Sequence, residues 1–311
     1  MILLVMSGCV KELVPEDNGY QPKVVLWAML SSDSVVKVIT SGNRGLSDKD
    51  VVNIPAIDMF LYENDIMIDK IYSQSISSDT QSHYFDIKPK SDNTYTIKLF
   101  NQSIEITGIV KLPQPLLVPE MIKLSQGENA QLEYTLKDDI NFEDAYQFDV
   151  IIYQIGTLTD TSDNSVIDIN YKIIKKYDRY DEPTLNYNLL GLNNLAITDF
   201  TFPVNDNLFN GKKKTFLFTV QNPVTDVFII PRTILSGPPV SDQFKCRRMF
   251  IVIKCRKITP EYYKFLISEN KNSSIFGTPY FNPTNVYTNI TGGLGLVSGM
   301  DERHDTIWIR K

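Results

Sequence analysis

The chain contains 311 residues, of which 42% are hydrophobic and 22% are charged, and it carries a formal net charge of −6. This length exceeds that of one typical domain, and the hydrophobic content is sufficient for buried cores, so the composition excludes an intrinsically disordered protein. The acidic charge balance argues against DNA or RNA as a partner, because nucleic acids bind clustered lysine and arginine.

The first residues resemble the end of a bacterial lipoprotein signal peptide. Residues 1–9 form an apolar run that ends in Ser7, Gly8 and Cys9, and in such signals the peptide is cut before the cysteine, which is then acylated. The run lacks the basic segment of a complete signal, which also has about 7–15 apolar residues, and we attribute this to a start codon placed downstream of the true one. The alternative is an ordinary apolar N-terminus with a stray thiol.

We therefore predict lipidation at Cys9 and assign residues 1–22 to a signal remnant and a tether. Beyond this run, no segment offers about 18 consecutive apolar residues. We expect membrane attachment only through Cys9.

The segment that follows predicts short β-strands. Its apolar stretches are rich in β-branched and aromatic residues and are separated by Ser, Asp, Asn and Gly. The predicted strands cover residues 24–29, 35–40, 56–62, 94–100 and 104–110. In the fourth, Tyr95, Ile97 and Leu99 share one face, which is typical of a half-buried strand. Residues 23–113 are therefore predicted to form an immunoglobulin-like β-sandwich.

Two prolines, Pro113 and Pro115, indicate a domain boundary, because proline is excluded from central strands. Residues 114–311 are assigned to a second, larger antiparallel β domain with one short helix. Its predicted strands cover residues 131–136, 146–153, 171–177, 215–220 and 250–254. The helix begins after Thr259, which is a suitable N-cap and is followed by Pro260. We expect its aromatic face to pack on the sheet of the second domain.

The remaining cysteines predict no disulfide within their strand. Cys246 and Cys255 lie an odd number of positions apart, so they point to opposite faces of one strand. A disulfide to another chain or a metal site is the functional alternative. Two buried free thiols are the favoured interpretation.

No catalytic motif is visible. The chain has only two histidines, and neither lies in a nucleophile motif, a zinc motif or a phosphate-binding loop. His83 follows a polar loop and is expected to be exposed, and His304 is placed in a charged turn over residues 301–305. We predict no catalytic residue, no cofactor and no metal site.

Three further groups of residues are candidate binding sites. The first comprises acidic clusters that offer oxygen ligands for calcium but lack ordered EF-hand spacing, so solvated loops are favoured: Asp138, Asp139, Glu143 and Asp144, and Asp160, Asp163 and Asn164. Residues 292–295 are glycine-rich but lack a following helix, so they predict turns that lead into a last strand. Lys212, Lys213 and Lys214 follow Asn210-Gly211 and predict an exposed hairpin turn, with an electrostatic contact as the alternative.

The C-terminal region resembles a known family. Its helix carries Tyr262-Tyr263-Lys264-Phe265-Leu266, and residues 281–290 (FNPTNVYTNI) precede the glycine-rich segment 292–299. These motifs are similar to those of the Bacteroidota outer-membrane lipoproteins known as domain of unknown function 4249. The N-terminal strands and Gly108–Pro113 also fit, so the resemblance covers nearly the whole chain from Cys9. Val297 departs from it, since an aromatic residue is common there.

The resemblance implies an accessory lipoprotein that is partnered with a TonB-dependent receptor at the outer membrane. Both the periplasmic and the cell-surface face are consistent with Val10-Lys11-Glu12, which partly resembles a surface-export signal. We expect a non-enzymatic binding module that captures nutrients with such a receptor. The alternative is a surface hydrolase that acts on an extracellular polymer.

Overall fold

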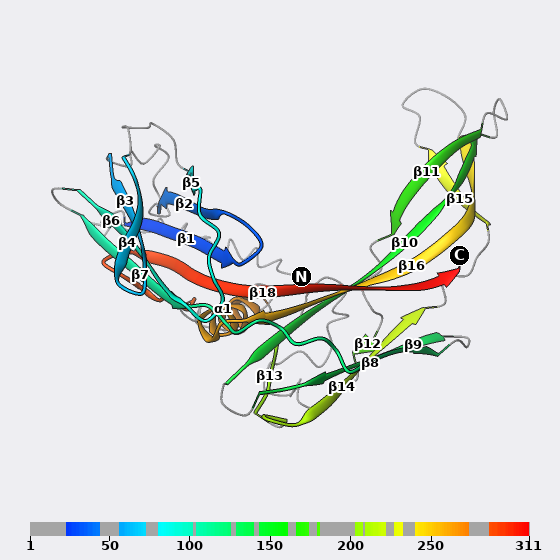
Figure 1. Cartoon of the computed structure of the whole chain (residues 1–311). Helices are drawn as coiled ribbons and strands as arrows, with labels where there is room; N and C mark the ends of the chain where they lie inside the picture. The colour runs from blue at the N-terminus through cyan, green and yellow to red at the C-terminus, as the bar shows by residue number, and fades with distance from the viewer. Residues whose placement is uncertain are drawn as a thin grey trace, which may run out of the picture.

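The structure is a computed structural model of the chain, and it confirms a mainly β protein with one helix (Figure 1). It describes residues 23–43, 56–72, 80–101, 104–125, 129–139, 143–160, 166–173, 179–180, 203–207, 209–221, 227–232, 240–273 and 286–310. Within these ranges no helix is long and apolar enough to cross a membrane. Cys9 and the tether lie outside the described residues.

The largest sheet has nine strands and runs through the whole molecule. Its order is β11-β10-β16-β18-β1-β2-β5, with β13 paired to β10 and β15 paired to β16. The strands are β1 (Val24–Ser31), β2 (Val36–Gly42), β5 (Thr80–Phe85), β10 (Ala145–Asp160), β11 (Val166–Ile173), β13 (Pro203–Asn205), β15 (Val227–Arg232), β16 (Val240–Ile258) and β18 (Leu294–Arg310).

Two smaller sheets pack against this long sheet at separate places. The five-stranded sheet has the order β17-β7-β6-β3-β4 and the four-stranded sheet has the order β12-β14-β9-β8. The first contains β3 (Asp58–Glu63), β4 (Ile66–Ile71), β6 (Thr94–Phe100), β7 (Glu105–Lys111) and β17 (Ile290–Thr291). The second contains β8 (Met121–Ser125), β9 (Asn129–Lys137), β12 (Arg179–Tyr180) and β14 (Lys213–Gln221).

The described residues form two hydrophobic cores, one in each sandwich. In the first sandwich β1, β2, β5 and the start of β18 face the five-stranded sheet, with Leu26, Tyr95 and Val297 fully buried. In the second sandwich β10 and β16 face the four-stranded sheet around Phe148 and Phe216, whose ring centroids are 4.5 Å apart. The strand β18 passes from one sandwich to the other (Figure 1).

The C-terminal strands complete the N-terminal sandwich. Strand β18 pairs with β1 in parallel over Leu294–Met300, and β17 pairs with β7. Gly108 of β7 makes this packing possible, since a Cβ at that position would lie 2.4 Å from Val297 Cγ2. The sequence predicts a domain boundary at residue 113. In the structure, strands from both sides of that residue share one sheet and one core.

The helix α1 (Pro260–Ser273) begins where the sequence predicts. The Tyr262 N–H donates to Thr259 Oγ1 at 3.5 Å, and the hydroxyl also accepts the Gly299 N–H at 3.3 Å. Phe265 lies edge-on to Trp27 of β1 with a ring-centroid distance of 4.9 Å. The Tyr263 hydroxyl also accepts the Asn205 amide N–H of β13 at 3.1 Å, so the aromatic side of the helix contacts the second domain, as the sequence predicts, and in addition covers a strand of the first sandwich.

Most predicted strands are present, and the differences are informative. Strand β6 has the predicted bounds, whereas β10 and β16 are much longer than predicted and β11 ends at Ile173. The charged segment 301–305 was predicted to be a turn, which is wrong, because it lies inside β18 and pairs with β16. Its charges are accommodated in a strand because they alternate between two faces that offer different partners.

Candidate functional site

The outer face of the second sandwich is the side of β10, β16 and β18 that points away from the four-stranded sheet. Core residues such as Phe148 and Ile253 occupy the inner positions of these strands, and side chains alternate along a strand. The intervening residues therefore form the outer face. The inter-strand register aligns them in rows across the three strands.

One row is aromatic and is called the aromatic row below. It consists of Tyr153, Phe250 and Trp308, which are paired across neighbouring strands. The Tyr153 and Phe250 rings stack at 4.9 Å with an interplanar angle of 8°, and Phe250 lies 4.9 Å from Trp308. Trp308 remains 45% exposed. Tyr153 and Phe250 are half-buried, and aromatic side chains with partly exposed rings are enriched at recognition surfaces.

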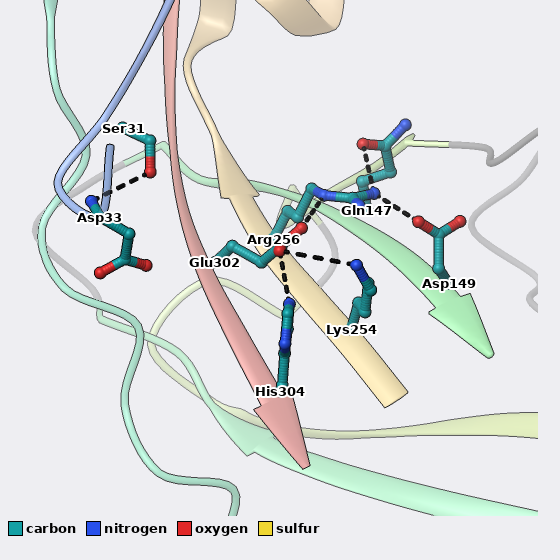
Figure 2. Close-up of polar contacts among 8 residues, drawn as sticks. All are labelled: Ser31, Asp33, Gln147, Asp149, Lys254, Arg256, Glu302 and His304. Carbon is teal, nitrogen blue, oxygen red and sulfur yellow. Dashed lines mark hydrogen bonds and ion pairs between the residues drawn. The ribbon is translucent and has the colours of Figure 1, made fainter. Parts of the chain in front are cut away.

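Two further rows of the outer face are charged or polar and are called the charged rows (Figure 2). They comprise Asp149, Lys254 and His304 in one row, and Gln147, Arg256 and Glu302 in the next. The Arg256 guanidinium donates to Asp149 Oδ2 at 2.6 Å and to Glu302 Oε2. Glu302 also lies 2.5 Å from His304 Nε2.

These contacts shift the pKa values of the groups that make them. Burial opposes the charge of Arg256, but Asp149 and Glu302 outweigh it and raise the pKa of the guanidinium. Burial likewise opposes the charge of Glu302, but His304 and Arg256 lower the pKa of that carboxyl. The charged rows therefore satisfy one another, and the row of Ile151, Val252 and Thr306 separates them from the aromatic row.

A second cluster is buried at the other end of β10 and is called the carboxylate cluster. Asp138, Asp144 and Asp206 are 4%, 7% and 1% exposed, and one carboxylate oxygen from each lies within 4.8 Å of the others. The prediction of solvated loops is wrong for Asp138 and Asp144, because protein groups rather than water surround these carboxylates. Asp138 accepts hydrogen bonds from the Tyr146 hydroxyl at 2.6 Å and the Gly211 N–H at 2.9 Å.

The other two carboxylates are also held by the protein. Asp144 contacts Lys257 Nζ, and Asp206 Oδ2 accepts the Asp144 N–H at 2.7 Å. Burial raises the pKa of Asp144 although Lys257 opposes the shift, and burial raises the pKa of Asp206 to about 6. Three carboxylates of this kind form a donor set suited to a hard cation, but an ammonium group occupies part of it. The cluster is built to hold protein groups together.

A cleft of about 200 Å³ lies beside this cluster. It separates the segment Leu112–Gln114 from the start of α1, and Glu143 and Asp144 line it. Asp92 and Lys111 also line the cleft, and their side chains form an ion pair of 2.8 Å. The cleft is small and shows no nucleophile beside a base.

Other residues weighed from the sequence lie apart from both clusters. His83 was predicted to be exposed, which is wrong: it lies in β5, its Nε2 is buried without a hydrogen-bond partner, and burial lowers its pKa. Cys255 is a buried free thiol, as predicted. The side chains of Cys246, Asp160, Asp163 and Asn164 lie outside the described residues.

The glycine-rich segment begins in a turn, and the lysine-rich segment follows one. Gly292, with φ of 78°, lies between β17 and β18, as the sequence predicts. The three lysines follow a turn between β13 and β14, and Lys213 forms an ion pair of 2.6 Å with Glu120. These two strands do not pair with each other, so the predicted hairpin is wrong. The aromatic row, in contrast, had no sequence signal, because its three residues meet only through strand register.

Comparison with known proteins gives one extended match. A family model described as a domain of unknown function (DUF4249) covers residues 10–306. Curated proteins give no significant match.

Similar solved structures share little with the chain. A calcium-binding mutant of Bacteroides uniformis beta-glucuronidase 2 is 8% identical with a TM-score of 0.21, and the match covers 76% of this chain and 30% of that chain. The collagen adhesin from S. aureus is 8% identical with a TM-score of 0.13, over 93% of this chain and 94% of that chain. Scores this low support no inference.

Proposed function

Because the chain belongs to the DUF4249 family, we propose that it is a non-enzymatic accessory lipoprotein. In this proposal an acylated Cys9 holds it at the bacterial outer membrane, where it docks on a TonB-dependent receptor and assists nutrient capture. The observation that supports a docking role is the aromatic row, with Trp308 45% exposed on the same face as charged rows that are already paired.

The chemistry of the outer face fits a protein partner. Trp308 packs against Phe250, which in turn stacks on Tyr153, so part of its side-chain freedom is already lost before binding. Tryptophan and tyrosine are enriched among the residues that dominate binding energy at protein interfaces. The paired charges around Arg256 give the same face a polar region farther along the strands, and polar surface around an apolar centre is typical of interfaces.

The alternative, a surface hydrolase, has weaker support. Carboxylate pairs carry out glycoside hydrolysis when both groups reach the substrate. Asp138, Asp144 and Asp206 are at most 7% exposed and each contacts a protein donor or cation. Their arrangement therefore favours a structural role over catalysis.

Co-purification tests the proposal. The full protein with a complete signal peptide is tagged and purified from detergent-solubilised outer membranes, and its partners are identified by mass spectrometry. We expect a TonB-dependent receptor with the wild-type protein and at least about tenfold less of it with Trp308→Ala, because central aromatic contacts dominate interfaces. Leu217→Ala is the matched control, since Leu217 is 44% exposed on β14.

Two results would count against the proposal. One is equal recovery of the receptor with Trp308→Ala. The other is the absence of any receptor together with hydrolysis of a polysaccharide by the purified protein, which would favour the hydrolase.

A further inference from the structure

Lys257 occupies a core-facing position in β16. Ile251, Ile253 and Cys255 alternate along the same strand and are fully buried in the second core, and Lys257 continues this side with 5% exposure. Lysine is almost never buried to this extent without a charge partner. The fold therefore places the Lys257 amine inside the second sandwich, where it requires a partner of opposite charge.

Asp144 is that partner, and the backbone fixes its position. It directly precedes β10, in which Tyr146 is aligned with Lys257 across the strand pair, and its Oδ2 contacts Lys257 Nζ. The Asp144 N–H donates to Asp206 Oδ2 at 2.7 Å, and the Asp206 N–H donates to the Asp144 carbonyl at 3.0 Å. Neighbouring strands thus hold the amine and the carboxyl in contact.

Two other carboxyl groups flank this contact. Oxygens of Asp138 and Asp206 lie within 4.8 Å of an oxygen of Asp144. Asp138 already accepts hydrogen bonds from Tyr146 and Gly211. Asp206 is the better proton carrier, because burial raises its pKa to about 6 even though the Asp144 N–H opposes the shift.

A buried Lys257–Asp144 ion pair carries a desolvation cost. Desolvation of two buried ions is recovered by their attraction only when further hydrogen bonds satisfy both groups. Burial also raises the pKa of Asp144, although Lys257 opposes it. Transfer of one proton from Nζ to the carboxylate gives a neutral amine in contact with a neutral carboxylic acid, which are the reactants of amide formation.

We propose that Lys257 and Asp144 are joined by an intramolecular isopeptide bond, with Asp206 as the proton carrier. The Nζ lone pair attacks Cγ of the protonated Asp144, so an N–C bond forms and the carbonyl becomes tetrahedral. Asp206 accepts a proton from the nitrogen and returns one to the departing hydroxyl oxygen. The C–O bond then breaks, and the products are one amide and one water molecule, without oxidant or cofactor.

The mass of the intact protein tests this proposal. A full-length Cys9→Ser variant, which cannot be acylated, is measured under denaturing conditions. We expect a mass lower than the sequence mass by one water molecule, and a Lys257→Arg variant in the same background with its full sequence mass. Tryptic digestion should yield a branched peptide that contains both Asp144 and Lys257.

Asp206→Ala keeps both reacting groups and tests the proton carrier. We expect this variant to fold, as judged by circular dichroism, and to retain its full mass. A water loss in Asp206→Ala would overturn the role of Asp206. A full mass in the protein with native Asp144, Lys257 and Asp206, or a water loss confined to a linear peptide, would overturn the bond and leave a buried ion pair.

Discussion

The side-chain amide of Asn289 hydrogen-bonds both backbone groups of Val297. Its Nδ2 donates to the Val297 carbonyl at 2.7 Å, and its Oδ1 accepts the Val297 N–H at 2.9 Å. These are the bonds that a neighbouring strand would supply at the first half of β18. Asn289 also donates to the Ile109 carbonyl of β7 at 3.2 Å, so one side chain joins two sheets of the first sandwich.

Replacement of Asn289 by alanine should destabilise the protein by roughly 2–4 kcal/mol, because it leaves both backbone groups of the fully buried Val297 without these partners. Chemical denaturation monitored by tryptophan fluorescence measures the change. Thr291→Ala, at an exposed residue of the neighbouring β17, should have little effect. Equal stability of Asn289→Ala and the wild type would show that water replaces the amide.

Gly108→Ala should destabilise the protein by about 1–3 kcal/mol, the usual cost of overpacking a core. The added methyl group would lie 2.4 Å from Val297 Cγ2 and 2.8 Å from Ile290 Cδ1. A second substitution, Val297→Ala, removes the closer clash. The double variant should therefore lose less stability than the sum of the two single variants, and simple additivity would contradict the packing described here.

His83→Leu should be neutral or stabilising, and it should reduce the loss of stability in acid. Burial lowers the pKa of His83 below its ordinary value of 6.5, so the unfolded chain binds a proton there more readily than the folded protein does. The wild type therefore loses stability as pH falls through about 6.5. Melting temperatures at pH 8 and pH 5 measure the effect, and an unchanged pH dependence in His83→Leu would contradict it.

Arg256→Met should destabilise the protein by about 1–3 kcal/mol, because Asp149 and Glu302 lose their shared donor on a partly buried face. Lys254→Met is the control, since its nitrogen lies 4.0 Å from Glu302 and should matter less. Urea denaturation at low and high salt separates these cases. A larger effect for Lys254→Met would show that the guanidinium is not the centre of the charged rows.

The sequence predicts strands well where apolar and polar residues alternate. Tyr95, Ile97 and Leu99 of β6 show this alternation, and its bounds were predicted without error. The sequence predicts a turn in the second half of β18, because residues 301–305 are all charged or titratable. Its partners are distant in the chain: Asp305 accepts the Tyr134 hydroxyl at 2.8 Å, and Asp301 accepts the Leu116 N–H at 2.7 Å.

The candidate sites were less predictable than the fold for a physical reason. Tyr153, Phe250 and Trp308 form a row only because three strands align in one register, which no local pattern specifies. The sequence predicts Asp138 and Asp144 as a cluster, but Lys257 reaches it from β16 and Asp206 from the residue after β13, and both change its environment from solvent to protein.

The parallel pairing of β1 with β18 sets the order in which this chain can fold. The Ser298 hydroxyl donates to the Ala28 carbonyl across 270 positions of sequence. During synthesis the first sandwich must therefore wait, with one edge of β1 unpaired, until almost the whole chain has emerged. Contacts of such long range slow folding, and an open strand edge attracts other chains. We therefore expect refolding to be slow and to yield more aggregate as the protein concentration increases.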